Sequence, residues 1–217
     1  MPSAPDGLLM PAGQYHCLRH RLQAMLSPAR MAHSLGVMAT ARVMAPSMGA
    51  DPAQAELAGL VHDVAKEFPP QEMIRLASEA GITFCQPCER HPIYLHAPVG
   101  AFLAERCLGV SDVAVLEAIA VHSYGGPTPR LDDPLAWALR LADLTEPNRR
   151  FDAADGRRWA WACKGWRYAG WLACTNLERY LTRIGVPCHP NVVEVARELG
   201  HSQHASTDPL APSPLPY

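Results

Sequence analysis

The sequence has no apolar run long enough to cross a bilayer. Nowhere in its 217 residues does an uninterrupted apolar stretch approach the roughly 20 residues that a membrane-spanning helix requires. The N-terminal segment also lacks a basic stretch followed by a long apolar core, so it does not resemble a secretory signal peptide. These absences predict a cytoplasmic protein that has no membrane partner.

A large excess of charge of one sign is also missing. The formal net charge is −2 at pH 7, from 19 Lys and Arg against 21 Asp and Glu. Dedicated nucleic-acid binders usually carry a basic face, so this balance argues against a nucleic-acid partner. The 7 cysteines are odd in number and lack the spacing of a secreted disulfide scaffold. We therefore expect free thiols in a reducing compartment.

Strand-like alternation is almost absent, and the local signals that remain are those of helices. The length suits one core, which predicts an all-α domain over residues 15–200 between flexible tails at 1–14 and 201–217. A capping residue followed by proline opens predicted helices at 27–48 and 51–66. Further predicted helices cover residues 70–80, 95–107, 111–122, 133–144 and 155–184, and a last one starts at Pro190.

Side chains of the metal-ligand type fall on the core-facing sides of five predicted helices. They are His33, His62, Asp63, His96, His122 and Asp143. A single histidine on an apolar face is usually a core residue bonded to a carbonyl, and one His-Asp pair can arise by chance. A group of such residues aimed at one centre is costly to bury unless a cation lies there. The pattern predicts a metal site, and two ions are the most economical interpretation.

Helical periodicity supports this placement. His33 shares a stripe with Val37 and Ala41, and Asp143 follows Leu139 at a step of four. Adjacent residues on a helix point about 100° apart, so the neighbouring His and Asp side chains can both reach a metal. The two carboxylate oxygens of that aspartate could bridge two ions.

The segments that hold these residues resemble the HD-domain metal-dependent phosphohydrolases. They read RMAHSLGV, AGLVHDVAKE, HAPVGA, AIAVHSYG and LADLTEPNRRF, between residue 30 and about residue 151. The additional histidines His96 and His122 make the chain similar to the YqeK-type branch, the symmetrical diadenosine tetraphosphate hydrolases. The loop at 123–126 departs from the Thr-Thr-Gly usual in that branch. The resemblance implies an HD-domain helical bundle with a dinuclear centre, and it favours iron over manganese, cobalt or zinc.

The resemblance also divides the ligands between two transition-metal ions that share one carboxylate. One ion would be held by His33, His62, Asp63 and Asp143. The other would be held by Asp63, His96 and His122. Two cations about 3.5–4 Å apart can activate water and neutralise the charge of an attacked phosphate. Asp63, as the bridging ligand, is therefore expected to be catalytic.

Three cationic side chains are candidates for contacts with phosphate. Lys66 lies one turn beyond the His-Asp pair and is expected to take part in catalysis and substrate binding. A lysine near a helix end can instead simply complement the helix dipole. Arg30 and Arg149 are expected to bind phosphate oxygens in a fork-like manner, although Arg149 could equally be a solvated surface charge.

The ligand set and the resemblance together predict an enzyme whose substrate is a dinucleoside polyphosphate. The expected reaction is the symmetrical hydrolysis of diadenosine tetraphosphate to two ADP. The alternatives are another HD-type nucleotide phosphohydrolase and a non-catalytic nucleotide-sensing protein, because the metal ligands alone do not determine which substrate is bound. The complete ligand set argues against the sensor. The oligomeric state stays open, with a homodimer as one option.

Two further features have simpler explanations. Cys85 and Cys88, followed by His91, imitate half of a zinc knuckle, but the sequence offers no second CxxC at a suitable distance. A loop with free thiols is therefore expected. The tryptophans within 159–171 could stack on an adenine, but at such helical spacings they favour core packing or a subunit contact.

Overall fold

The computed structural model describes residues 9–83, 90–123, 131–149, 152–185 and 188–204, which form helices and no strand. The helices are α1 (Ala12–Met25), α2 (Pro28–Met48), α3 (Pro52–Val61), α4 (Pro70–Glu79), the short 3-10 helix η1 (Pro92–Leu95), α6 (His96–Leu108), α7 (Val113–Val121), α8 (Pro134–Thr145), α9 (Asp152–Lys164), α10 (Trp166–Arg183) and α11 (Pro190–His204). The all-α prediction is confirmed. Within these described ranges no helix is long and apolar enough to cross a membrane.

The helices α2 and α3 begin at capping residues that can be recognised in the sequence. Ser27 Oγ accepts a hydrogen bond from the N–H of Arg30 at 3.2 Å. Asp51 Oδ1 accepts from the N–H groups of Ala53 and Gln54 at 2.8 and 2.9 Å. Both helices have proline at their first position, where a missing N–H costs no hydrogen bond. The predicted starts of α2 and α3 are confirmed.

The end of α3 differs from the prediction. The helix stops at Val61, and residues 62–67 follow as turns that are closed by bonds such as Lys66 N–H to Asp63 O at 2.9 Å. Glu67 accepts hydrogen bonds from the N–H and the hydroxyl of Ser27, both at 2.7 Å. These hydrogen bonds hold Glu67 against the start of α2, where a chain that continued the α3 helix would not place it. The predicted helix over 51–66 is therefore wrong beyond Val61.

The tryptophan-rich stretch forms two helices where one was predicted over 155–184. Gly165 separates α9 from α10 and has φ +82°. This left-handed conformation cannot be part of a right-handed helix, and glycine adopts it without steric cost. The break turns α10 into a separate helix that packs against both α9 and α11.

The predicted N-terminal tail at 1–14 is too long, because the folded part includes residues 9–14. Met10 is buried, and its N–H donates to Glu56 Oε1 at 2.9 Å. The N–H of Leu9 donates to the same carboxylate at 3.0 Å, and Arg42 Nη1 pairs with it at 3.2 Å. Glu56 is fully buried, and a buried carboxylate requires such donors. At the other end α11 continues past the predicted boundary at 200, and residues 1–8 and 205–217 lie outside the described ranges.

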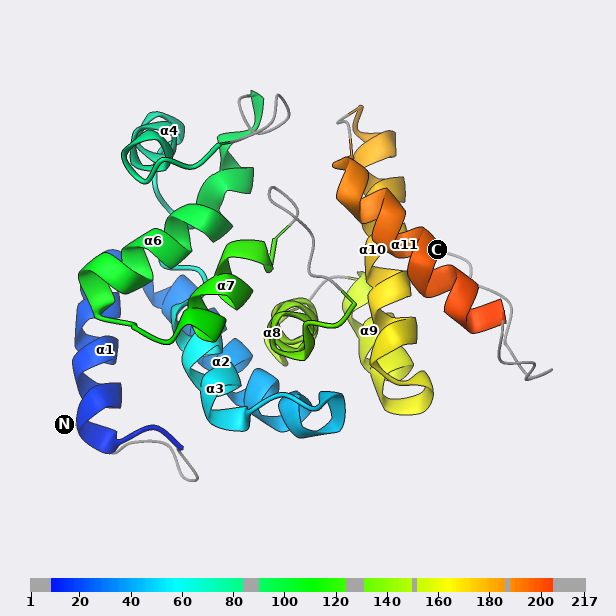
Figure 1. Cartoon of the computed structure of the whole chain (residues 1–217), viewed down its shortest axis with the longest axis horizontal. Helices are drawn as coiled ribbons and strands as arrows, with labels where there is room; N and C mark the ends of the chain where they lie inside the picture. Colours follow the sequence, from blue (N-terminus) through cyan, green and yellow to red (C-terminus); the bar gives the residue numbers. More distant parts are fainter. Residues whose placement is uncertain (1–8, 84–89, 124–130, 150–151, 186–187, 205–217) are drawn as a thin grey trace.

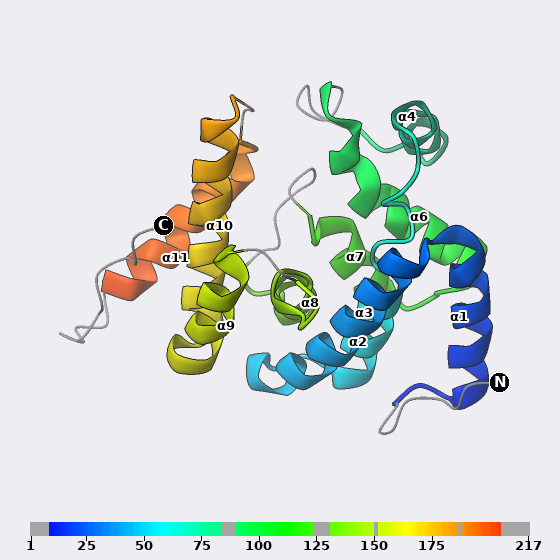
Figure 2. The ribbon, with the colours of Figure 1, turned by 180° about the vertical axis from the view of Figure 1, so that it is seen from behind.

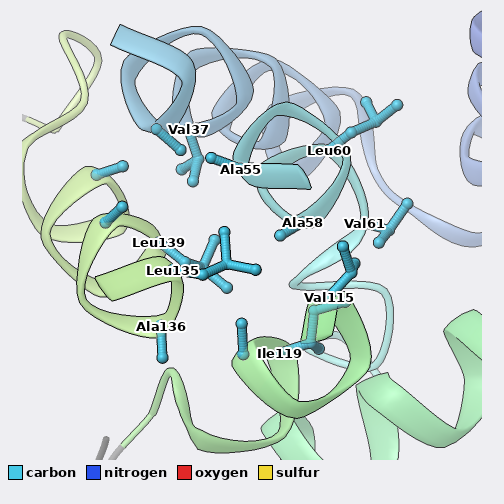
Figure 3. Packing of buried hydrophobic residues seen from close by; sticks show 14 of the residues in the cluster. Val37, Ala55, Ala58, Leu60, Val61, Val115, Ile119, Leu135, Ala136 and Leu139 are labelled. Atoms are coloured by element: carbon cyan, nitrogen blue, oxygen red, sulfur yellow. The ribbon is translucent and has the colours of Figure 1, made fainter. Parts of the chain in front are cut away.

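The main core lies between α2, α3, α7 and α8. Figure 3 shows Val37, Ala58, Ile119 and Leu139 pointing toward one another from these four helices. Each of the four side chains has no exposed surface. One continuous apolar contact therefore holds together these four helices, which carry or precede every predicted ligand except His96 of α6.

A glycine sets the distance between α2 and α3. A Cβ atom on Gly59 would lie 2.7 Å from Met38 Cα and 2.8 Å from Met38 N, both backbone atoms. Only glycine lets the two helices cross this closely. The crossing brings His33, on α2, beside the His-Asp pair that follows α3.

Two groups of helices flank this core. α1, α4 and α6 lie on one side and α9, α10 and α11 on the other, with α8 between α7 and α9 in both views (Figure 1, Figure 2). Trp137 of α8 is fully buried, and its ring centroid lies 5.7 Å from that of Trp166 of α10. Trp161 and Trp171 are partly buried against the same core. The preference for core packing is confirmed for Trp166 and Trp171. Trp161 also contacts the core and is half-buried, and the side chain of Trp159 lies outside the described residues.

Candidate metal centre

The predicted ligand residues meet in one cluster. Their donor atoms form three overlapping groups, and within each group the atoms lie within 4.8 Å of one another: His33, His62 and Asp63; His62, His122 and Asp143; and Asp63, His96 and His122. All are buried except Asp143, which is half-buried. The structure therefore brings together every residue that the sequence nominated as a ligand.

Most of these ligands stand at helix ends rather than within helices. His62 and Asp63 occupy the turn after α3, and His122 follows the last residue of α7. His96 is the first residue of α6. The expectation that each ligand lies inside a helix is therefore wrong for His62, Asp63 and His122.

Three of the histidines are oriented in the same way, by the backbone carbonyl of the residue three positions earlier. Nδ1 lies 2.9 Å from the carbonyl oxygen in His62–Gly59, 2.5 Å in His96–Ile93 and 2.6 Å in His122–Ile119. A carbonyl oxygen can only accept, so Nδ1 carries the proton in each ring. The lone pair then lies on Nε2, which is the atom that faces the cluster.

The bridging role expected of Asp63 agrees with the positions of its two oxygens. Oδ2 lies 3.6 Å from His33 Nε2 and 3.5 Å from His62 Nε2. Oδ1 lies 3.5 Å from His96 Nε2 and 3.8 Å from His122 Nε2. Each oxygen of the carboxylate thus faces a different pair of histidines.

The donor set fits a metal ion. His62 Nε2 is buried and has no hydrogen-bond partner among the described residues. Leaving such a lone pair without a partner costs free energy that a cation would recover. Imidazole nitrogens and carboxylate oxygens that face one another are the ligation preferred by zinc, iron and related ions.

His33 is oriented by a side chain that the sequence analysis did not assign to the site. Its Nδ1 lies 3.1 Å from Glu146 Oε1, and Glu146 is 1% exposed. The other oxygen of Glu146 accepts from the N–H of Asn148 at 2.7 Å. The available signal was its position only three residues after Asp143; Glu146 follows Thr145, the last residue of α8, with a non-helical backbone.

Replacing Glu146 with alanine should lower metal affinity by about 10–100-fold, because partners that orient a ligand typically contribute this much. Glu146→Gln keeps an oxygen acceptor for His33 and should lose less. Chelator competition on the purified variants measures the effect. Glu117→Ala, at an exposed position of α7, is the control. Wild-type affinity in Glu146→Ala would show that His33 needs no such support.

All three cationic side chains proposed for phosphate binding reach the cluster and contact ligands. Arg30 Nη1 lies 2.7 Å from Asp63 Oδ2, Lys66 Nζ lies 2.9 Å from His96 Nε2, and Arg149 Nη2 pairs with Asp143 Oδ1. Lys66 lies within the turns after α3, outside the helix, so complementing a helix dipole does not explain it. Arg149 also donates from Nε to the Asp143 carbonyl at 2.8 Å, which does not fit a solvated surface charge.

The environment favours the metal-binding protonation state at His96, His122, Asp63 and Asp143 but not at His62. Burial lowers the pKa of His62, but the charges of Asp63 and Asp143 outweigh this effect and raise that pKa. Burial lowers the pKa of His122 and, together with the charge of Lys66, brings the pKa of His96 well below its ordinary value. Burial raises the pKa of Asp63, but the charge of neighbouring histidines outweighs it and holds this pKa well below its ordinary value. Burial also raises the pKa of Asp143, but its hydrogen bond with His33 and the charge of Arg149 outweigh this and hold the pKa well below its ordinary value. Neutral imidazoles and ionised carboxylates are the forms that bind metals.

A polar cleft leads to the cluster. Its volume is about 270 Å³, and its walls include Arg30, His33, Glu67, Glu146 and Arg149. We call it the site cleft. Cys85, Cys88 and residues 124–126, singled out in the sequence, lie outside the described residues.

Histidine and aspartate donors from several helices and from the turns that follow them, with arginine and lysine around them, define a helical metal-dependent hydrolase of phosphate compounds. The family model described as HD domain matches residues 30–156, so the chain belongs to the HD domain family. HD-domain hydrolases bind divalent metal ions, and the cluster of this chain is able to hold them.

Similar proteins agree with this family. "Bis(5'-nucleosyl)-tetraphosphatase, symmetrical" of Bacillus subtilis is 37% identical over 134 residues, which are 62% of this chain and 70% of the relative. The protein of the same name from Halalkalibacterium halodurans is 37% identical over 134 residues, 60% of this chain and 67% of the relative. A crystal structure from Clostridium acetobutylicum, described as a predicted HD superfamily hydrolase involved in NAD metabolism, has a TM-score of 0.78 and 32% identity over 87% of this chain and 97% of that chain. The predicted resemblance to the HD-domain phosphohydrolases and their YqeK-type branch is confirmed.

Proposed function

We propose that the protein hydrolyses diadenosine tetraphosphate symmetrically and releases two ADP. The observation that supports this most directly is the buried cluster of histidine and aspartate donors at the end of a polar cleft. The two relatives described above at 37% identity are named as enzymes of this reaction. The alternatives share the fold, but another nucleotide phosphohydrolase would release other products and a sensor would release none.

We also propose two metal ions, with iron as the first candidate and manganese, cobalt or zinc as alternatives. One would be held by His33, His62, Asp63 and Asp143, and the other by Asp63, His96 and His122. The separate histidine pairs on the two oxygens of Asp63 support this division. When bound, such ions lower the pKa of a water molecule and neutralise charge on the attacked phosphate.

The cationic side chains would position the polyphosphate. Arg30 and Arg149 both line the site cleft through which a phosphate chain would enter. A guanidinium carries five N–H donors, so Arg30 can hold Asp63 through Nη1 and still donate to a phosphate oxygen. Lys66, on the opposite side of Asp63 at His96, adds a positive charge beside the same carboxylate.

Replacing Lys66 with alanine should lower turnover by about 10–100-fold while the metals stay bound, because one charge-assisted contact is lost. Steady-state kinetics and metal analysis on the same sample measure this. Lys164→Ala is the matched control, since Lys164 is the other lysine of the sequence and is exposed. If the metal content falls together with turnover, Lys66 acts by supporting His96 and not by contacting phosphate.

The reaction is tested by its products. Diadenosine tetraphosphate should give ADP alone, and reaction in oxygen-18 water should label the β-phosphate of one ADP. AMP together with ATP would indicate an asymmetric cut and refute the proposal. Binding without turnover when iron, manganese, cobalt or zinc is supplied would favour the sensor. Preferential hydrolysis of nucleoside triphosphates would favour another phosphohydrolase.

A further inference from the structure

A second and larger groove adjoins the site cleft. Its volume is about 690 Å³, and its walls are residues of α2 between Gly36 and Met44, the segment Thr145, Pro147 and Asn148, and Arg158 and Trp161 of α9. We call it the α2–α9 groove. Asn148 lines both the groove and the site cleft, so the two cavities meet at this residue.

The two cavities differ in chemistry. The site cleft is lined mainly by charged and polar side chains, whereas the groove presents Ala39, Val43, Met44, Pro147 and Trp161. The indole of Trp161 is half-buried, which leaves part of it accessible from the groove. An apolar cavity with an accessible aromatic ring, next to a cationic cleft, suits a ligand with a flat aromatic group joined to phosphates.

The spacing along α2 suits such a ligand as well. Ala39 and Val43 follow His33 by six and ten residues, which correspond to about 9 and 15 Å along a helix axis at ~1.5 Å per residue. In a four-phosphate dinucleotide that is cut at its centre, two phosphates and a ribose separate the attacked phosphorus from the base. The groove therefore lies where a base would fall if its phosphates occupied the site cleft.

Arg158 fixes the groove relative to the metal centre. Its Nε donates to the Thr145 carbonyl at 2.8 Å, and its Nη2 donates to the carbonyls of Glu146 at 2.7 Å and Arg149 at 2.9 Å. These bonds connect α9 to the segment after α8 that contains Glu146. The side chain of Glu146 orients His33. Trp161 lies one helical turn beyond Arg158, so its position is coupled to that of the cluster.

We propose that the α2–α9 groove binds the nucleoside of one half of the substrate, with the base stacked on Trp161. The inference rests on the proposed function, because it requires a substrate with a nucleobase. The Thr40 hydroxyl, which lines the groove, donates its hydrogen to the Gly36 carbonyl at 2.8 Å, so it has no hydrogen left to donate to a base. Recognition by stacking tolerates different bases, so guanine and adenine dinucleotides should both bind.

The test separates the base from the phosphates. In Trp161→Ala the KM for diadenosine tetraphosphate and the Kd for ADP should rise about tenfold or more, within the range that base–aromatic stacking supports. The affinity for inorganic diphosphate, the metal content and kcat should stay close to wild type. Trp161→Phe keeps a stacking ring and should restore most of the ADP affinity. Tyr180→Ala, which removes an exposed aromatic ring from α10, is the matched control.

Val43→Trp provides a second variant that does not remove a packed side chain. Val43 is 72% exposed, so the substitution should be tolerated and should narrow the groove. The variant should bind ADP more weakly than wild type and should bind inorganic diphosphate equally well. Equal losses of ADP and diphosphate, or unchanged ADP affinity in both Trp161→Ala and Val43→Trp, would refute the nucleoside site while leaving tetraphosphate hydrolysis intact. If the wild-type protein neither cleaves the dinucleotide nor binds ADP, both the proposed function and the groove assignment fail.

Discussion

Asp63→Ala should lose both metal ions and at least about 1000-fold in turnover, which corresponds to ~4 kcal/mol of barrier. The reason is that Oδ2 faces His33 and His62 while Oδ1 faces His96 and His122. Elemental analysis of protein purified without chelator, together with tetraphosphate hydrolysis, measures both effects.

Two comparisons make the Asp63 experiment decisive. His96→Ala should mainly empty one site, so its metal content should fall to about half that of wild type and not to zero. Glu105→Ala, at an exposed position of α6, should leave metal and activity unchanged. Retention of both ions by Asp63→Ala would contradict the bridging role. A wild-type protein that is folded and active without metal would contradict the metal centre itself.

Gly59→Ala should lower the free energy of unfolding by about 3 kcal/mol, at the upper end of the cost of overpacking a core. The added Cβ would lie 2.7 Å from Met38 Cα, and a helix backbone cannot swing aside as a side chain can. α2 and α3 would have to separate, which moves His33 away from Asp63. Urea denaturation measures the stability, and chelator competition should show weaker metal binding.

The matched control for Gly59 is Gly13→Ala. Gly13 also lies in a helix, α1, but a Cβ there would meet no atom within 4 Å. Alanine has the higher helix propensity, so this variant should be as stable as wild type or slightly more stable. If Gly59→Ala unfolds at the same urea concentration as Gly13→Ala, the close helix crossing does not limit stability.

The sequence was sufficient to nominate ligands such as His33 and Asp143 because they continue apolar stripes. His33 follows the face of Val37 and Ala41, and this face has to point inward whatever the exact angle between the helices. The resemblance to the HD-domain family then divided the ligands between two ions. Neither argument needed a tertiary contact.

The parts that were not predicted depend on contacts between distant residues. α3 ends before Asp63 where Glu67 bonds to Ser27, 40 positions away in the chain. The early proline-rich residues suggested a mobile tail, but the carboxylate of Glu56 binds the N–H groups of Leu9 and Met10. Glu146 could be assigned to the site only once α2 and α8 were known to lie side by side. Local propensity carries no information about such pairs.

The hydrogen bonds of the four histidines have a consequence for how this centre tolerates mutation. Three rings take their orientation from main-chain carbonyls, at Gly59, Ile93 and Ile119. No amino-acid substitution deletes a carbonyl, so a substitution at the residue that supplies the carbonyl does not remove the hydrogen-bond acceptor of these three ligands. His33 alone relies on a side chain, that of Glu146. In a random mutant library, the changes that weaken metal binding by releasing a ligand ring should therefore concentrate at position 146, whereas a change such as Gly59→Ala acts by moving the helices apart.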